Sequence, residues 1–243
     1  MKRTLLSLAI LMATPVVAEE AKTFSLDGEF GLILTTGNTE TTSVSAGLTA
    51  KQELENWSND YLIEGLYKKE TNQVNGEDVD QVSAQKFFAS AQGNYKLENP
   101  NHRLFGFASY EDDRLGAYKY QATIAAGWNQ KVWQNDVSSF EYSVGPGYAF
   151  QETNEGEDAD SFIVRGSAAY RWNISDTAKF TQTLSTEVGS DNTKSRAETA
   201  LTAKINGSLS MKVALKLDHN TDVPETRKNL DSETSVTLVY TFF

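Results

Sequence analysis

Apolar and polar residues alternate along most of this chain, and the alternation returns at short intervals. The C-terminal segment shows it with one face formed by Val236, Leu238, Tyr240 and Phe242 and the other by Glu233, Ser235, Thr237 and Thr241. A period of two residues is that of a β-strand with one apolar and one polar face. The pattern therefore predicts an all-β protein.

Twelve segments carry this alternation, and clusters of turn-forming residues separate them. They span residues 24–35, 41–53, 60–71, 82–95, 103–111, 118–133, 139–151, 161–173, 178–189, 196–206, 210–219 and 232–243. Short polar turns alternate with longer, more acidic connections such as 72–81 and 220–231, an asymmetry typical of outer-membrane barrels. We predict a transmembrane antiparallel β-barrel of about 12 strands, with short periplasmic turns and longer extracellular loops.

Aromatic residues of the apolar faces gather at two heights of the predicted barrel. Near the periplasmic ends are Tyr61, Tyr95, Trp133, Phe140, Tyr142, Tyr170, Trp172, Phe180, Tyr240 and Phe242, and near the outer ends are Tyr67, Tyr110, Tyr118, Tyr120, Tyr148, Phe150 and Phe162. Two belts are expected of a membrane barrel, because Trp and Tyr favour both membrane interfaces. A periplasmic β-sandwich also contains aromatic residues, but it predicts neither two belts nor a terminal aromatic strand.

The N-terminal residues have the features of a secretory signal peptide. Lys2 and Arg3 precede an apolar run, and Ala18 ends a group of small residues placed for cleavage before Glu19. A retained transmembrane helix would need about 20 apolar residues, more than this run contains. We therefore predict a signal peptide at 1–18 and a mature barrel at 19–243. The absence of cysteine excludes lipid attachment at this signal and disulfide bonds in the exported domain.

Composition fits a barrel and not a helical membrane protein. The mean hydropathy is −0.46, and 39% of the residues are hydrophobic. A barrel strand turns half of its residues toward a polar interior, so this polarity is compatible with a membrane barrel. The formal net charge is −11 and becomes more negative once Lys2 and Arg3 are removed, which argues against nucleic acid as a partner.

Three segments resemble a known family. They are Thr36–Glu40 (TGNTE), Tyr142–Tyr148 (YSVGPGY) and the ending from Asp231 through Phe242. On these segments the chain resembles the salt-induced outer-membrane protein family, also described as YdiY-like and as a domain of unknown function. The resemblance implies an outer-membrane barrel and suggests induction by salt or acid stress, and it supplies no biochemical activity. This chain departs from the familiar ending by one additional residue, Phe243.

The predicted partners follow from an outer-membrane location. They are outer-membrane lipid, lipopolysaccharide and the barrel-assembly machinery, for which the terminal aromatics Tyr240, Phe242 and Phe243 form a candidate assembly signal.

Charged residues on the polar faces suggest an activity. The basic ones, on the eighth to eleventh strands, are Arg165, Arg171, Lys179, Arg196, Lys204, Lys212 and Lys216. The acidic ones, on the first, third, seventh and twelfth strands, are Asp27, Glu29, Glu64, Glu141 and Glu233. Opposed walls of this kind would produce a transverse field across a narrow water-filled channel. Charges paired across a closed barrel explain the same residues, and twelve strands do not decide between the two.

Other candidate sites are weaker. Acidic loops contain three groups of carboxylates: Glu77, Asp78 and Asp80; Asp112 and Asp113; and Glu152, Glu155, Glu157, Asp158 and Asp160. None has the spacing of a calcium-binding loop, so we predict solvated loops and no metal site. Hydrolysis would require His102, in a turn, or His219, between Asp218 and Asp222, and no partner motif accompanies either. We predict no catalytic site and no cofactor.

Overall fold

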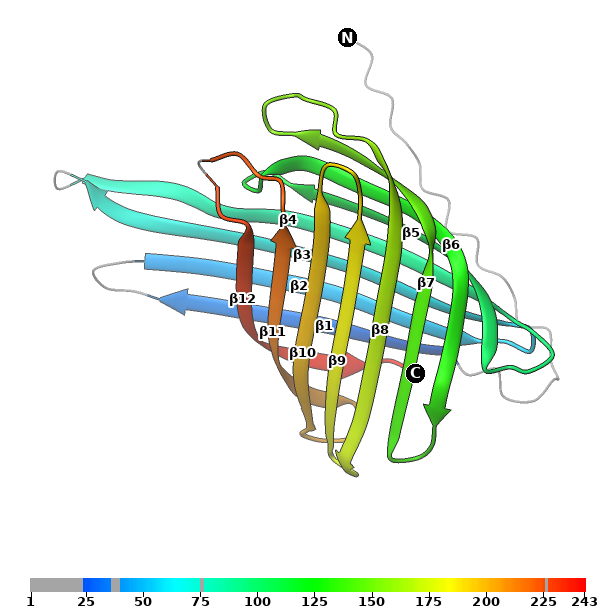
Figure 1. Ribbon diagram of the computed structural model, residues 1–243. Coiled ribbons are helices and arrows are strands. Elements are labelled where there is room, and N and C mark those ends of the chain that lie inside the picture. The colour runs from blue at the N-terminus through cyan, green and yellow to red at the C-terminus, as the bar shows by residue number, and fades with distance from the viewer. Residues whose placement is uncertain (1–23, 36–39, 75–76, 226) are drawn as a thin grey trace, which may run out of the picture.

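The computed structural model describes residues 24–35, 40–74, 77–225 and 227–243, and these residues form a closed antiparallel barrel (Figure 1). Its twelve strands are β1 (Phe24–Thr35), β2 (Glu40–Glu53), β3 (Trp57–Val74), β4 (Glu77–Lys96), β5 (His102–Asp113), β6 (Tyr118–Gln134), β7 (Ser138–Thr153), β8 (Ser161–Ser175), β9 (Ala178–Val188), β10 (Thr193–Lys204), β11 (Leu209–Asn220) and β12 (Leu230–Thr241). The predicted fold class and strand number are confirmed. The predicted signal peptide and most of the TGNTE segment lie outside the described residues.

Each strand pairs with its neighbours in sequence, and β12 returns to β1. The connections 54–56, 97–101, 135–137, 176–177 and 205–208 lie at one end of the barrel, which we call the short-turn end. We call the opposite end, which carries 114–117, 154–160 and 221–229, the long-loop end. No helix in the described part of the chain is long and apolar enough to cross a membrane.

The connection expected at 72–81 is mostly strand, so that prediction was wrong. β3 and β4 pair as far as Val74 and Glu77, and their hairpin reaches beyond the other strands in Figure 1. A bulge between Lys68 and Lys69 shifts the register, and Lys69 then forms an ion pair of 2.6 Å with Asp80. Polar cross-strand pairs such as Thr71–Asp80 extend this hairpin, and apolar alternation does not mark such pairs.

The two faces of the strands differ as the alternation predicts. Large apolar side chains on the outer face are exposed, among them Leu48, Ile63, Ile124 and Leu238. The inward faces of three of these strands carry the buried polar residues Ser58, Thr123 and Thr237. Because the polar groups line the interior and apolar groups cover the outside, the molecule has the reversed polarity of a membrane barrel.

Tyr118 is an exception to the predicted outer aromatic belt. Its side chain is buried, and its hydroxyl donates a hydrogen bond of 2.8 Å to the backbone carbonyl of Asp222. A bulge between Tyr118 and Tyr120 turns the first residue of β6 from the outer face to the inner one. Tyr120 stays outside and stacks on Tyr110 at 6.3 Å between ring centroids.

The Gly-Pro-Gly segment of β7 makes a close approach to β6. A Cβ atom at Gly145 would lie 2.1 Å from the carbonyl oxygen of Ala126 and 2.7 Å from the Cα of Gly127. The approach is reciprocal, because a Cβ at Gly127 would lie 2.3 Å from the carbonyl oxygen of Val144. Pro146, between the two glycines of β7, has no N–H to donate. Only glycine permits this contact between backbones.

The junction between β1 and β12 is the shortest in the barrel. Four residue pairs join these strands, from Asp27 opposite Thr241 to Phe30 opposite Leu238. Each of the other neighbouring pairs of strands is joined by at least eleven. Within the described residues, β12 from 230 to 237 therefore pairs in register with β11 alone.

We expect fast hydrogen exchange in this part of β12. Successive backbone N–H groups of a strand point alternately to its two neighbours, so about half of those in 230–237 face β1 without a ladder partner. These amides should exchange faster than those of 196–203 in β10, which is paired on both sides. Mass spectrometry of peptides from both segments, with the barrel in detergent, measures the difference. Equal protection of the two segments would contradict an open junction.

Candidate functional site

The interior of the barrel contains a polar cavity of about 470 Å³ toward the short-turn end. Residues from all twelve strands line it. A second cavity of about 250 Å³ opens at the long-loop end and is lined by the connections 115–117 and 223–228 together with strand residues. We call these the inner cavity and the outer vestibule. A smaller cavity of about 140 Å³ shares Arg196 and Lys212 with the inner cavity and Lys86 and Asp218 with the outer vestibule.

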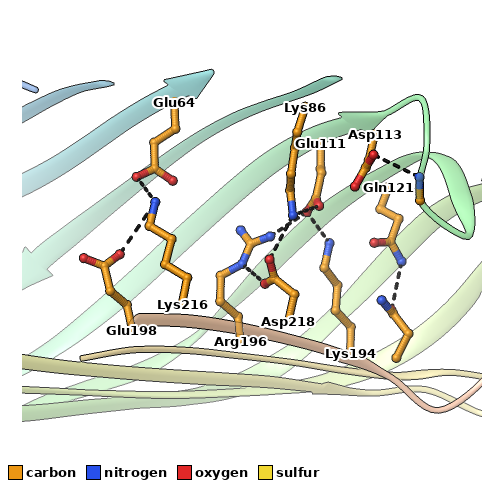
Figure 2. A network of polar contacts seen from close by, with 12 residues as sticks. Glu64, Lys86, Glu111, Asp113, Gln121, Lys194, Arg196, Glu198, Lys216 and Asp218 are labelled. Carbon is orange, nitrogen blue, oxygen red and sulfur yellow. Dashed lines mark hydrogen bonds and ion pairs between the residues drawn. The ribbon is translucent and has the colours of Figure 1, made fainter. Parts of the chain in front are cut away.

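An ion-pair layer lies where these cavities meet (Figure 2). Its centre is Glu111 of β5, which accepts contacts from Lys86 at 2.9 Å, Lys194 at 2.7 Å and Arg196 at 2.8 Å. Asp218 of β11 bridges two of the same cations, at 2.8 Å from Lys86 and 2.5 Å from Arg196. The five residues come from β4, β5, β10 and β11, so the layer links opposite walls of the lumen.

A second set of ion pairs continues the layer toward β1 and β3. Lys216 binds Glu64 and lies 3.9 Å from Glu198, and Lys212 contacts Glu198 at 2.9 Å and Glu29 at 3.1 Å. Glu198 thus lies between two lysines of the neighbouring strand β11. Three carboxylates of β1, β3 and β10 thus surround the two lysines of β11.

Two guanidinium groups rest on phenylalanine rings inside the lumen. Arg165 lies 3.6 Å above the ring centroid of Phe107 and 3.4 Å from Glu187, which accepts a hydrogen bond from Thr123. Arg196 lies 4.3 Å above Phe88. A ring under a guanidinium group offsets part of its lost hydration and leaves the planar edge free for hydrogen bonds.

Eleven of the twelve charged residues predicted for the lumen wall line a cavity. The inner cavity is bordered by Asp27, Glu29, Glu64, Glu141, Arg165, Arg171, Lys179, Arg196 and Lys212, and the smaller cavity by Lys216 and Glu233. Lys204 lies at the end of β10, on the same face of that strand as Arg196 and Glu198. The strand phases therefore place these residues in the interior.

Two separated walls of charge do not describe this interior. Glu187, Glu198 and Asp218 lie on the strands predicted to be basic, and they pair with Arg165, with Lys212 and with Arg196. The sequence was sufficient to place these three carboxylates in the interior. Each lies on the same face of its strand as the inward-facing basic residues of that strand.

Lys86 and Glu111 were missed for a different reason. The fourth and fifth strands carry apolar residues on both faces. In β5 the buried Phe105 and the half-buried Phe107 point inward, and Leu104 lies exposed on the other face. When both faces of a strand are apolar, hydrophobicity alone cannot show which face points into the lumen.

The histidines and acidic loops do not form a second site. His102 begins β5 and packs edge-on against Trp128 at 5.2 Å between ring centroids. His219 follows Asp218 on β11, so the two side chains leave opposite faces of the strand. Among the residues that the structure describes, no group of three or more His, Asp or Glu side chains is arranged to hold a metal ion.

Comparison with known proteins supplies the family. The model of the family described as "Protein of unknown function, DUF481" matches residues 28–242. The chain belongs to this family. A relative among DUF481-like proteins is the "Uncharacterized protein YdiY" of Escherichia coli (strain K12), which is 28% identical over 224 residues that cover 92% of this chain and 85% of the relative. The resemblance drawn from sequence motifs is confirmed.

Solved structures with the same fold are outer-membrane barrels. The COG4313 outer membrane channel from Pseudomonas putida F1 aligns with a TM-score of 0.52 at 10% identity, covering 93% of this chain and 97% of the channel. The NanC porin aligns with a TM-score of 0.51 at 8% identity, covering 90% and 98%. At these identities the likeness shows a shared barrel fold between this DUF481 chain and the two proteins.

Proposed function

We propose that this protein is a narrow passive channel of the bacterial outer membrane for small ions and polar solutes. The observation that carries the proposal is the pair of cavities separated by an ion-pair layer. A barrel of about eight strands has an interior that side chains can fill, and twelve strands leave the additional space in which this cavity lies. The channel and the porin that share the fold support the same function.

The ion-pair layer would act as the constriction of this channel. Its side chains occupy the lumen between the inner cavity and the outer vestibule, and its fixed charges of both signs replace part of the hydration of a passing ion. Lysine side chains are long and rotatable, so Lys86 and Lys194 can change partners without a change in the backbone. We expect small conductance and a low size limit.

Liposome swelling tests permeation directly. The mature chain is refolded into liposomes, and swelling is followed in isotonic arabinose and in isotonic raffinose. We expect arabinose to enter faster than it enters protein-free liposomes and the larger raffinose to remain excluded, because the ion-pair layer narrows the lumen. Heat-modifiable gel migration confirms that the barrel is folded in the same preparation. Folded protein with no arabinose entry would contradict the channel.

The layer also favours a second function, that of a non-conducting structural or stress-response protein of the envelope. Lys86, Glu111 and Arg196 link the two sides of the lumen, and a layer that never rearranges would close it. This alternative predicts folded barrels that carry no solute and a loss of envelope integrity on deletion under high salt.

The membrane arrangement follows from the same proposal. The short-turn end would face the periplasm, where the predicted signal peptide delivers the chain, and the long-loop end would face lipopolysaccharide. Tyr240 and Phe242 lie on the outer face with their ring centroids 4.9 Å apart, and Phe243 packs near Phe24 at 6.0 Å. Exposure of these rings at the end of β12 supports recognition by the assembly machinery.

A further inference from the structure

Three basic residues at the short-turn end of the lumen have no ion-pair partner among the described residues. They are Arg171 of β8, Lys179 of β9 and Lys204 of β10. Four other basic residues of this wall lie closer to the long-loop end, on β8, β10 and β11. Each has at least one carboxylate within 4.0 Å; they are Arg165, Arg196, Lys212 and Lys216. Uncompensated positive charge is therefore confined to one end of this wall.

Strand register places the three residues along a diagonal. Arg171 is opposite Thr181, two residues from Lys179, and Lys179 is opposite Thr202, two residues from Lys204. Residues two positions from a cross-strand partner share its face, and diagonal neighbours lie within reach of long side chains. Arg171 and Lys179 line the inner cavity, and Lys204 lies beyond them toward the short-turn end.

Charges around Lys179 leave an excess of cations. Arg171, Lys51, Lys212 and one carboxylate, Asp27, are close enough to act on it. Lys51 is already paired with Asp60 at 3.3 Å, and Lys212 with two glutamates. The carboxylate of Asp27 accepts a hydrogen bond of 2.6 Å from Thr241.

The remaining carboxylate of the inner cavity without an ion-pair partner in the described part of the chain is Glu141 of β7. It is opposite Lys131 of β6 and Ala169 of β8, two residues from Arg171, so Glu141 is a diagonal neighbour of Arg171 on the same face. Glu141 is thus shared between Lys131, which lies directly opposite, and Arg171, and its strand β7 is not a neighbour of the strands that carry Lys179 and Lys204. Arg171, Lys179 and Lys204 therefore face two nearby carboxylates, Asp27 and Glu141, neither of which forms an ion pair with them, and a bound anion would lower the repulsion among the three cations.

We propose that Arg171, Lys179 and Lys204 form a binding subsite for a small organic anion that carries a carboxylate or phosphate group. Arg171 presents a planar fork suited to two oxygens of such a group, and Lys179 supplies a second donor. The hydroxyl-bearing side chains Ser139, Thr181 and Thr202 line the same cavity and suit the hydroxyl groups of a polar solute. The inner cavity of about 470 Å³ is within the range of small-molecule sites.

The subsite deepens the proposed channel function and rests on it for the path by which the anion arrives. An anion held at the short-turn end would be concentrated on that side of the constriction. Lys204, nearer the end of the lumen, would attract it before Arg171 and Lys179 bind it.

Calorimetric titration of the folded mature barrel in detergent tests binding without any need for conductance. The probes are glucose 6-phosphate, glucuronate and neutral glucose, which have similar size. The double variant Arg171→Gln/Lys179→Gln is compared with the matched control Arg114→Gln/Lys119→Gln, which removes the same charge from residues at the long-loop end that line none of the three cavities. We expect at least one anion to bind at least about tenfold more tightly than glucose, and the double variant to lose about tenfold in affinity while the control loses none.

The outcomes separate cleanly. Tight binding of glucose 6-phosphate alone assigns the subsite to phosphate, and tight binding of glucuronate alone assigns it to carboxylate. Equal affinity for glucose and both anions, or an unchanged affinity in the double variant, would overturn the subsite. The charge-reversed single variant Lys179→Glu provides a second test if the double variant fails to fold, and it should abolish anion binding.

The subsite and the channel can fail separately. Barrels that bind the anion but conduct no current would contradict the channel and support the subsite. Barrels that conduct current but bind neither anion would contradict the subsite alone.

Discussion

Replacement of Glu111 with glutamine is expected to destabilise the barrel by about 3 kcal/mol, the order of loss found when one partner of a buried ion pair is removed. The side chain of Glu111 is 8% exposed and has three cations within 2.9 Å. In Glu111→Gln, Lys86, Lys194 and Arg196 would share Asp218 as their remaining carboxylate within the layer. Urea unfolding in detergent micelles, followed by tryptophan fluorescence, measures the loss.

The matched control for this prediction is Glu152→Gln. Glu152 forms an ion pair of 2.7 Å with the exposed Lys119 at the long-loop end, so its removal leaves no buried charge. The control should unfold at nearly the same urea concentration as the parent protein. A Glu111→Gln variant as stable as the control would show that water, and not the carboxylate, satisfies the three cations.

Substitution of Gly145 by alanine is expected to be the most damaging single methyl addition in the barrel. The new Cβ would lie 2.1 Å from a carbonyl oxygen of β6 and 2.7 Å from the Cα of Gly127, and neither backbone atom can rotate away. Overpacking usually lowers the free energy of unfolding by about 1–3 kcal/mol. Because the atoms in the way belong to the backbone, we expect a loss at or above the upper end of this range. We expect a much smaller folded fraction in heat-modifiable gels after refolding under identical conditions.

Gly106→Ala serves as the comparison for that experiment. Gly106 lies in β5, and a Cβ built there meets no atom within 4 Å. This variant should fold as well as the parent protein, because it adds the same methyl group to a strand without a close approach. Equal folding of Gly145→Ala and Gly106→Ala would mean that β6 and β7 separate at little cost.

The architecture could be predicted because a membrane barrel repeats one simple rule. Each strand alternates apolar and polar residues, and turn-forming residues separate the strands, so a local pattern is sufficient to count them. β8 and β9 illustrate this, since both begin where the pattern predicts, at Ser161 and Ala178. The same alternation places Arg165 and Lys216 in the interior.

Partners across the lumen could not be predicted from the same pattern. Alternation shows that Lys216 points inward, but its pairing with Glu64 joins β11 to β3, and their 152 residues of separation leave no local signal. The pairing depends on the tilt and register of the whole barrel. The two-wall hypothesis failed for a different reason, because it left out Glu187, Glu198 and Asp218, which lie on the strands assigned as basic.

The other two local errors, at Tyr118 and at 72–81, had different causes. Tyr118 has the correct residue type for an outer aromatic belt, but one extra residue before Tyr120 turns it inward. A bulge changes the face of a residue without changing the composition around it. At 72–81 the cause was composition, because β3 and β4 continue through polar residues that looked like a loop.

Single-channel recording in a planar bilayer is the most direct test of the proposed channel. The folded mature protein is added at low concentration, and conductance is measured first in symmetric potassium chloride and then in a salt gradient. We predict small, uniform current steps whose reversal potential shifts toward chloride in Glu111→Gln, because that change removes one negative charge from the constriction. Inserted, folded barrels without current steps would contradict the channel and favour a closed barrel held by its ion-pair layer.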